Sequence, residues 1–498
     1  MYRSPVQNNV SNTTGLRRNS VSFAGMVMLT LAGVLAIIGP IEIASFIGDA
    51  GPAAMWPVIL GYLLFVLVSL PILEYTRIAP FAGGYYGLAE LGFGRKAGKF
   101  TSLSNYFFYN FWQMANAFFI GWLAIDTVYI IYGIMLPIWF WLLICVLTLV
   151  ITLVMTIQPA RLLSRILVIV MVATTVLVTA FTIYVIARSP YNSAYYINPA
   201  NSPSGFTGIA LATAVLGFYL FAGYGAALFY GEEGVQARRT LWKAVYVGLT
   251  ISAVVIALSA YSEVVSVPKS DLANVGQASI PQLVTWIHYI PAGVLVGLNM
   301  FILVVSMIAY GAGGGSQARL LWAMSRDNFI KSQWLRKLDE KTQVPRRAAM
   351  VNFAFALFTV LVVAAVLVKV YGYNADTVSL GFFVAGTTST ILWYFHHFVP
   401  EFGLYAFLSR HREIKFSTAR KVLSGLVVPI GGTALFVYTF YEGIIGNLVE
   451  PYFGFVVMAL LIVVGVIAYT LYKARKGELG ESVVSYMVAE AGREGGER

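Results

Sequence analysis

The residues of this chain best suited to chemistry are helix breakers in the middle of two apolar segments. Residues 38–41 (Ile-Gly-Pro-Ile) interrupt the first segment, and residues 221–225 (Phe-Ala-Gly-Tyr-Gly) interrupt the sixth. Proline lacks an N–H group and clashes with the carbonyl four residues earlier, so it opens the helical hydrogen-bond ladder. At mid-membrane depth, freed backbone groups are tolerated only where protein or a water-filled cavity satisfies them. Breaks in corresponding helices therefore predict a solute site of the kind found in secondary transporters.

A broken helix offers complementary groups to a zwitterionic solute. A half-helix that begins near Pro40 presents free N–H groups and the positive end of its dipole, which suit a carboxylate. The carbonyls freed at the end of the preceding half-helix suit an ammonium group. A simple kink is the alternative, because Gly and Pro are common in membrane helices. The occurrence of two breaks in matching segments favours the binding site.

Glu42 follows the first break and is the candidate coupling residue. An unpaired charge near the bilayer centre costs about 3 kcal/mol on insertion scales, so such residues are functional candidates by default. An acid two residues after Pro40 also caps the first turn of a half-helix, and this structural role fits the pattern equally well. If Glu42 is functional, either it is protonated during part of the cycle or the substrate is a cationic amine.

The third apolar segment carries a polar stripe. Asn110, Gln113, Asn116 and Ala117 share one helical face, and polar amides in such a segment are expected to face the protein interior. They line the solute cavity or bond neighbouring helices. Gln113 and Asn116 are the candidates from this face for contact with the solute.

Histidine and cysteine do not predict a metal site. His396 and His397 are adjacent, so they point about 100° apart and cannot chelate one ion as an i, i+4 pair does. We expect them at the membrane interface with satisfied hydrogen bonds. Cys145 is the single cysteine, which excludes disulfides and cysteine metal sites. No metal and no cofactor are expected.

Charged residues follow the sixth and eighth apolar segments. Glu232 and Glu233, with Arg238 and Arg239, are expected to form ion pairs that act as an inner gate. Residues 319–347 begin with an amphipathic stretch and continue as a charge cluster, which predicts a segment lying along the membrane surface.

The elements that position these residues are membrane helices. Of the 498 residues, 59% are hydrophobic and 11% are charged, which excludes an ordinary soluble domain. Apolar runs of about 20 residues, the length that spans a bilayer, recur with short polar breaks. The sequence predicts an all-α integral membrane protein with about 12 transmembrane helices. These are expected near 23–46, 54–79, 101–133, 135–157, 161–187, 206–231, 240–266, 285–310, 348–370, 377–400, 421–442 and 452–473.

The net charge of +11 is a topology signal and does not indicate nucleic-acid binding. When alternate loops are grouped, all but three of the 33 Lys and Arg residues fall on the side of the N-terminus. The exceptions are Arg188, Lys269 and Lys369. Positive residues concentrate in cytoplasmic loops, so we expect a multi-pass protein of the cell membrane with both termini cytoplasmic.

Helices 1 to 5 and 6 to 10 overlay so that both first members are interrupted. Five is an odd number, so the second copy enters the membrane in the opposite sense, as an inverted repeat. The predicted parts are a polar cytoplasmic N-terminus, a first five-helix repeat, an outer connection, a second five-helix repeat, helices 11 and 12 with their preceding loop, and a cytoplasmic tail. They span 1–22, 23–187, 188–205, 206–400, 401–473 and 474–498 respectively.

Three stretches resemble the amino acid-polyamine-organocation (APC) superfamily of permeases. Residues 218–227 read Phe-Tyr-Leu-Phe-Ala-Gly-Tyr-Gly-Ala-Ala and are followed by the two glutamates and by Arg-Arg-Thr at 238–240, similar to the family's F-x-x-F-x-G-x-E-A-A, E-E and N-P-R-R-T. Residues 50–52 (Ala-Gly-Pro), 82–86 (Ala-Gly-Gly-Tyr-Tyr) and 93–94 (Phe-Gly) are similar to the ends of the family's second helix. Residues 317–327 resemble its A-R-x-x-x-A-M-A-R-D stretch.

The resemblance implies the leucine-transporter type of fold, with a 5+5 inverted repeat, discontinuous helices 1 and 6 and two further helices. It implies alternating access, with amino acids or related amines as substrates and a proton, another ion or exchange as the coupling. Tyr219 matches the family's aromatic gate. The positions matching the family's substrate contacts at the breaks are Ile37, Ile38, Gly39, Ile41, Phe221, Ala222, Gly223 and Tyr224.

Two departures from the family affect coupling. Gly225 stands where the family often has a Glu, and Val170 stands where some members have a proton-coupling Lys. Coupling schemes built on those residues do not transfer to this chain, which leaves Glu42 as the remaining titratable candidate.

The leading hypothesis is a secondary active transporter of amino acids or related amines, whose partners are a small-molecule substrate and the lipid bilayer. The alternatives are a polyamine or organic-cation carrier and a transporter-like solute sensor. An enzyme is not expected, because the H-E-x-x-H, G-x-S-x-G and P-loop motifs are missing from the sequence.

Overall fold

The computed structural model describes residues 15–34, 43–217, 219–412, 414, 416–443 and 452–482. The regular elements of these residues are helices, and the β-type pairing among them is one isolated bridge between Val21 and Gly234. The prediction of an all-α membrane protein is therefore confirmed. A helix satisfies its own backbone hydrogen bonds, which is what the bilayer demands of a spanning segment.

Ten helical stretches of the described residues are long and apolar enough to cross a membrane. They are α3 (Met55–Ile78), α5 (Arg95–Tyr132), α6 (Ile138–Thr156), α7 (Ala160–Arg188), α9 (Ala237–Val265), α12 (Ala292–Ala309) with α13 (Gly311–Arg326), α15 (Arg346–Tyr371), α16 (Ala375–Arg410), α17 (Thr418–Val422) with α18 (Val428–Gly443), and α19 (Tyr452–Arg475). Two shorter apolar helices, α1 (Phe23–Val34) and η6 (Tyr219–Tyr230), lie where the first and sixth spans were predicted.

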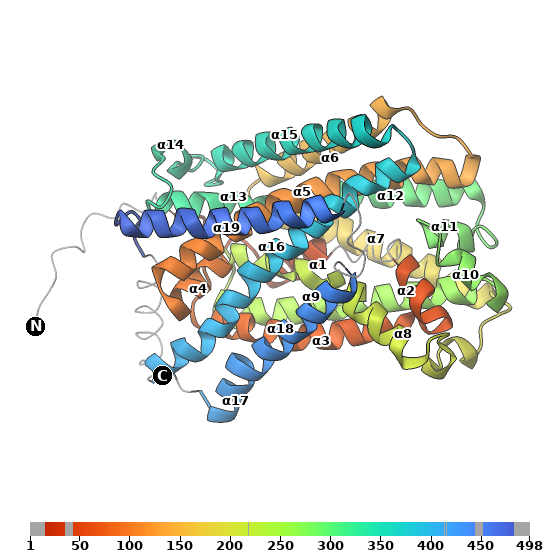
Figure 1. Ribbon diagram of the computed structural model, residues 1–498, viewed down its shortest axis with the longest axis horizontal. Coiled ribbons are helices and arrows are strands. Elements are labelled where there is room, and N and C mark those ends of the chain that lie inside the picture. The colour runs from red at the N-terminus through yellow and green to blue at the C-terminus, as the bar shows by residue number, and fades with distance from the viewer. Residues whose placement is uncertain are drawn as a thin grey trace, which may run out of the picture.

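The long helices run lengthwise through the molecule, and short helices gather at its two ends (Figure 1). One end carries α4 (Tyr85–Phe93), α14 (Gln333–Arg336) and α17. We call it the basic end, because the helices that finish there carry Arg77, Arg326, Arg410 and Lys473. The opposite end carries α2 (Ala44–Ala50), α8 (Gly205–Ala212), α10 (Leu272–Val275) and α11 (Pro281–Trp286).

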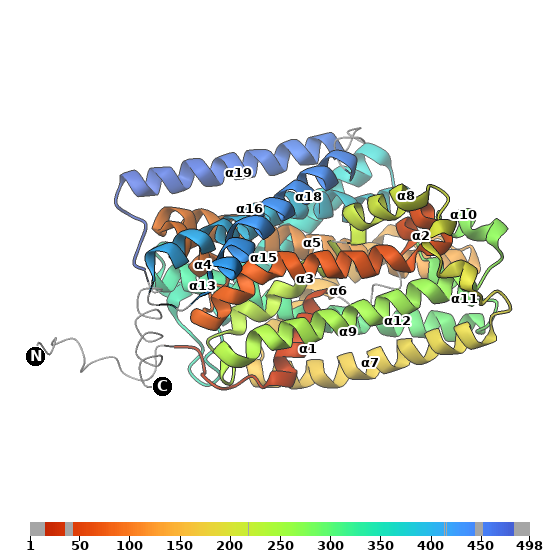
Figure 2. The same ribbon diagram turned by 90° about the horizontal axis from the view of Figure 1, so that it is seen from below.

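The helices differ in how deeply they are enclosed. In its most apolar stretch α5 is 72% buried, whereas α7, α15 and α19 are each 28% buried and lie at the outside of the molecule (α15 in Figure 1, α7 and α19 in Figure 2). Ile169, Val176 and Phe358 are among the large apolar side chains exposed on these helices. Such a continuous apolar surface requires lipid around it. Among the spanning helices of the described residues, α5 is therefore the most enclosed by protein.

The sixth predicted span is irregular. Its α-helical part ends at Ala212, a π-helical turn covers Thr213–Gly217, and η6 continues as a 3₁₀-helix to Tyr230. The irregular backbone begins several residues before the predicted break at 221–225. In the first span, α1 ends at Val34 and α2 begins at Ala44. The predicted break at 38–41 lies between them, outside the described residues.

The expectation that the stretch after residue 319 lies along the membrane surface was wrong for its first part. α13 continues the line of α12 into the protein, and its residues are buried from Gly311 to Ser325. Arg319 and Arg326 of this helix are instead paired inside, as described below. After Arg326 the chain forms a turn and the short helix α14 before α15 begins.

Candidate functional site

The two short apolar helices touch backbone to backbone. A Cβ atom on Gly223 of η6 would lie 1.8 Å from the carbonyl oxygen of Gly33 in α1, and a Cβ on Gly33 would lie 2.2 Å from the carbonyl oxygen of Gly223. Neither position can therefore accept a side chain without movement of the backbone. Glycine permits this close approach where the two irregular segments meet.

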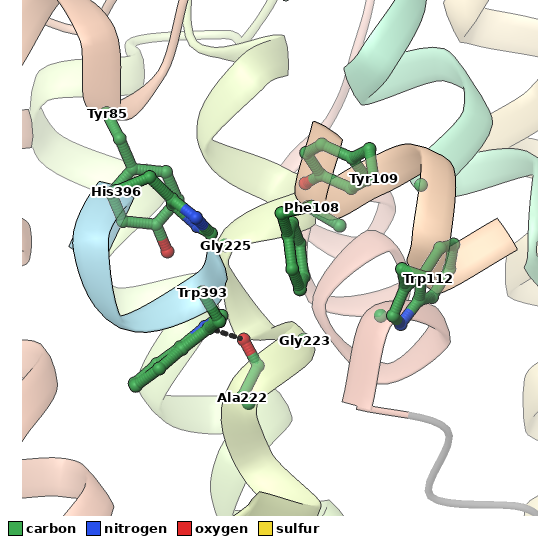
Figure 3. A pocket seen from close by; sticks show the side chains of 12 residues that line it. Tyr85, Phe108, Tyr109, Trp112, Ala222, Gly223, Gly225, Trp393 and His396 are labelled. Carbon is green, nitrogen blue, oxygen red and sulfur yellow. Dashed lines mark hydrogen bonds between the residues drawn. The ribbon is translucent and has the colours of Figure 1, made fainter. Parts of the chain in front are cut away.

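A small cavity lies beside this contact, with room for about one water molecule in the described conformation, so a solute needs it to widen (Figure 3). Its walls come from α1, α4, α5, η6, α13 and α16, so helices from both halves of the chain build it. The lining residues are Gly33, Tyr85, Phe108, Tyr109, Trp112, Ala222, Gly223, Gly225, Ala226, Gly313, Trp393 and His396. None of these described residues is Asp, Glu, Lys or Arg.

Half of the lining residues carry aromatic rings, and the others are Gly or Ala. His396 lies 4.7 Å from the ring of Phe108 and 5.0 Å from that of Tyr85, measured between ring centres. Trp393 donates a hydrogen bond from Nε1 to the carbonyl oxygen of Ala222 at 3.3 Å, visible as the dashed line in Figure 3. A carbonyl of the irregular η6 backbone is thus satisfied by an indole, which is the kind of compensation a broken membrane helix needs.

The wall can recognise an ammonium group or an apolar side chain. Aromatic faces attract cations, and they also exclude water from apolar groups. Glycine positions in η6 leave backbone groups accessible to a solute. These properties belong to a binding site for a small organic molecule.

Behind the wall, three fully buried side chains lie in a row, and the first two are joined by a hydrogen bond. Tyr224 Oη lies 2.8 Å from His397 Nε2, and His397 Nδ1 lies 2.6 Å from Glu401 Oε1. The side chains of His397 and Glu401 have no exposed surface. His396 and His397 were both expected at the membrane interface, and this expectation was wrong. α16 continues to Arg410, so both histidines lie inside a helix surrounded by protein.

Comparison with known proteins identifies the family. A model described as amino acid permease matches residues 19–469 of the 498-residue chain. This chain belongs to the amino acid permease family. It is a membrane-embedded secondary transporter and not an enzyme. No curated protein matches the permease in sequence.

A solved structure shares the fold of the permease. It is the crystal structure of the Eremococcus coleocola manganese transporter in complex with an aromatic bis-isothiourea substituted compound. The match has a TM-score of 0.58 at 13% sequence identity, and it covers 97% of the permease and 99% of the transporter. The whole helical arrangement is therefore that of a known type of transporter.

Some predicted site residues of the permease line the cavity and others stand behind it. Ala222 and Gly223 are in the lining. Phe221 packs against Tyr62 and Phe65, and Tyr224 packs against Phe65. The predicted residues of the first span, Ile37, Ile38, Gly39, Ile41 and Glu42, lie outside the described residues, as does the side chain of the predicted gate Tyr219.

The predicted contacts from the polar stripe of α5, Gln113 and Asn116, do not line the aromatic cavity. Gln113 Nε2 donates a hydrogen bond to Gln317 Oε1 of α13, and Gln113 lines a separate small cavity between α5, α6, α13 and α15. Asn116 is buried and lines neither cavity. On α5 the aromatic cavity is lined instead by Phe108, Tyr109 and Trp112.

Sequence reasoning missed the aromatic wall of the permease. Tyr85, Phe108, Tyr109, Trp112 and Trp393 were not proposed, because aromatic residues are frequent throughout a chain that is 15% Phe, Trp and Tyr. One signal was available for this region. Two histidines in the middle of an apolar helix need buried partners, and a search for those partners would have pointed inward.

Pairs of charged residues lie towards the basic end of the permease. Glu233 pairs with Arg319 of α13, with Nε 2.5 Å from Oε2, and both side chains are at most 3% exposed. Glu232 pairs with Arg326 at 3.3 Å and accepts a hydrogen bond from the backbone N–H of Ala82 at 3.1 Å. Burial raises the pKa of the Glu233 carboxyl, and the Arg319 guanidinium opposes the rise. These partners differ from Arg238 and Arg239, which the sequence suggested.

A second buried cluster joins α4, α5 and the turn after α13. Lys99 Nζ lies 3.6 Å from Glu90, 3.7 Å from Asp327 and 2.8 Å from the hydroxyl of Tyr86. The lysine has no exposed surface. The end of α19 also reaches this turn, because the backbone N–H of Glu481 donates to the carbonyl oxygen of Asp327 at 2.7 Å. The basic end is therefore tied together by charge pairs between distant segments.

Proposed function

We propose that this permease moves amino acids or related amines across the cell membrane by alternating access, and that the solute binds in the aromatic cavity beside α1 and η6. The observation that carries the proposal is the cavity itself. It lies where the Gly33–Gly223 contact brings together the two spans that the sequence marks as interrupted. Membership of the amino acid permease family supports the choice of substrate.

The cavity suits the two parts of such a solute differently. An ammonium group would lie against the faces of Tyr109 and Trp112 and near the backbone carbonyls of η6. A carboxylate would use the free N–H groups of the half-helix after the first break, where Ile41 is the predicted contact. An apolar side chain would fill the space between Phe108 and Trp393.

The second candidate is a polyamine or other organic cation. The observation that favours it is the wall of aromatic rings without an arginine or lysine among the described lining residues. Aromatic cages of this kind bind ammonium groups without needing a carboxylate on the solute. Competition between labelled amino acids and amines for uptake distinguishes the two substrates.

Alternating access requires one side of the cavity to be closed at a time. In this proposal the basic end is the closed side, because the Glu233–Arg319 and Glu232–Arg326 pairs join the turn after η6 to α13 there. We place this end in the cytoplasm, with both termini on that side, because it carries the positive charge. The repeats 23–187 and 206–400 are the bodies that we expect to move against each other.

Coupling to protons is part of the proposal. Glu42 is the candidate from the sequence, and the family residues that couple other members are replaced here by Gly225 and Val170. A proton gradient and exchange against a second solute are the two driving forces to compare.

Uptake of labelled amino acids and amines into proteoliposomes tests the proposal. We expect saturable uptake of at least one of them, and Phe108→Leu should raise KM by roughly 2- to 30-fold through loss of an aromatic face. The matched control is Phe119→Leu, on the same helix, because Phe119 is 2% exposed and packs against Phe382 away from the cavity. Absence of uptake for every amino acid and amine would defeat the proposal, and saturable binding without uptake would favour a sensor.

A further inference from the structure

One acidic side chain in the core of the permease has a partner that can share its proton. Glu401 Oε1 lies 2.6 Å from His397 Nδ1, and the other ring nitrogen of His397 lies 2.8 Å from the hydroxyl of Tyr224. We propose that Glu401 and His397 form a proton-binding site and that Tyr224 transmits its state to the solute cavity. The inference rests on the proposed function for its role in transport.

The groups around Glu401 and His397 do not fix the charge of this pair. Within the described part of the chain, Glu401 forms an ion pair with His397 and with no Lys or Arg. The elements packed against the pair carry titratable or charged groups, among them Tyr75, Tyr85, Glu90, Lys99, Tyr109, Tyr224, His396 and Arg410. Glu90 is held by Lys99, and Arg410 donates to the backbone carbonyl of Leu91 at 3.1 Å. The remaining groups are neutral hydroxyls and a second imidazole, and they do not fix the charge of Glu401.

Burial makes the bound proton the favourable state. A lone carboxylate inside a membrane protein costs several kcal/mol, whereas a carboxylic acid beside a neutral imidazole, or a carboxylate beside an imidazolium, has no net charge. Both forms hold one proton more than the carboxylate beside a neutral imidazole. That proton exchanges with water when a conformational change opens the site.

The hydrogen-bond direction at Tyr224 reports which state is present. When the pair holds the extra proton, His397 Nε2 carries hydrogen and donates to the oxygen of Tyr224. When the proton leaves, the remaining imidazole hydrogen stays on Nδ1, the ring nitrogen nearer to the carboxylate, and Nε2 becomes an acceptor. The hydroxyl of Tyr224 must then turn and donate. No bond other than these O–H and N–H bonds changes.

The hydrogen bond between Tyr224 and His397, whose direction changes with the proton, lies directly beside the cavity. Tyr224 stands between Gly223 and Gly225 in η6, and both glycines line the cavity. Trp393 also lines the cavity and stacks on the ring of His397 at 4.2 Å. An indole face favours the imidazolium over the neutral ring. A solute that moves Trp393 or the η6 backbone therefore changes the affinity of the pair for its proton, and by thermodynamic linkage the proton changes the affinity for the solute.

Infrared titration of the full-length permease in liposomes tests the proton site without any solute. We expect a band of a buried, protonated carboxylic acid that changes with pH, is removed by Glu401→Gln and has a shifted midpoint in Tyr224→Phe. The matched control is Glu263→Gln, since Glu263 is also fully buried but lies on α9. Retention of every titrating band in Glu401→Gln would overturn the inference.

Transport in proteoliposomes tests the coupling. With a solute that the wild type carries, Glu401→Gln should keep exchange of labelled against unlabelled solute but lose accumulation driven by a pH gradient. Accumulation equal to that of the wild type would overturn the inference, and so would loss confined to Glu42→Gln. If the wild type carries no amino acid or amine, the proposed function fails, while the infrared result still decides whether the proton site exists.

Discussion

The basic end and the middle of this permease each bury a glutamate, and the two glutamates have different kinds of partner. Towards the basic end, buried Glu233 has a permanent positive partner in Arg319, which holds its charge at every physiological pH. In the middle, the equally buried Glu401 has a histidine partner whose charge depends on a shared proton. The first arrangement fixes a structure, and the second can switch.

The difference follows what each region has to do. The charge pairs of the basic end join segments far apart in the sequence, such as the end of η6 and α13, so they hold one conformation together. In the proposed function the middle binds and releases a solute, and it is built from glycines, aromatic rings and a titratable pair. The two regions should therefore respond differently to matched substitutions.

The largest effect is expected at the permanent pair. Arg319→Met leaves the Glu233 carboxyl buried without its partner, and breaking such a pair costs about 3–5 kcal/mol. Unfolding in detergent, followed by circular dichroism, measures the loss. The double variant Glu233→Gln with Arg319→Met should recover most of it, because no uncompensated charge remains. An equally unstable double variant would show that the pair is not the source of the stability.

A smaller effect is expected at the contact of the broken spans. Gly223→Ala places a Cβ atom where 1.8 Å separates it from the carbonyl oxygen of Gly33, so α1 and η6 must move apart at a cost of about 1–3 kcal/mol. We expect transport to be lost as well, since this contact borders the cavity. Gly297→Ala is the control, because nothing lies within 4 Å of its added Cβ. Normal uptake by Gly223→Ala would separate the contact from the transport cycle.

A direct comparison of the two regions uses the same substitution in each. Glu401→Gln should change the unfolding free energy by about 1 kcal/mol or less, because an amide can replace the hydrogen bond of a protonated acid. Glu233→Gln should cost several times more, because it strands the Arg319 charge. Both glutamates are at most 3% exposed, so burial does not explain a difference. Equal losses would break the contrast between a permanent and a switchable partner.

The smallest effect concerns the segment after α19. Glu478 bonds Lys331 and Lys473 at 2.9 Å each, and these two hydrogen bonds lower the pKa of its carboxyl from the ordinary 4.5 to about 2. A lowered pKa in the folded state gives a stabilisation that is complete above 4.5 and is lost as the pH falls towards 2. Protease cleavage near Gly477 should therefore increase on acidification. In Glu478→Gln it should be fast already at neutral pH, and slow cleavage there would contradict the contact.

The sequence predicted the positions of the helices well and the contacts between them poorly. The apolar runs near 135–157 and 161–187 predicted α6 and α7 to within a few residues, because membrane insertion depends on local hydropathy. Glu233 and Glu232 were expected to pair with Arg238 and Arg239 nearby. In the structure Glu233 pairs with Arg319, 86 residues away. Such a pairing depends on how α13 packs, which no local pattern contains.

What the sequence determined by itself is an all-helical membrane transporter of the amino acid permease family, with interruptions expected in its first and sixth spans. Length, apolarity and helix-breaking residues decide these features within short windows of the chain. Only the tertiary structure decided that aromatic rings of α4, α5 and α16 close around Gly223, and that His397 lies between Tyr224 and Glu401. The physical reason is that a cavity is lined by whichever helix faces turn inward, and that rotation is set by packing among helices distant in sequence.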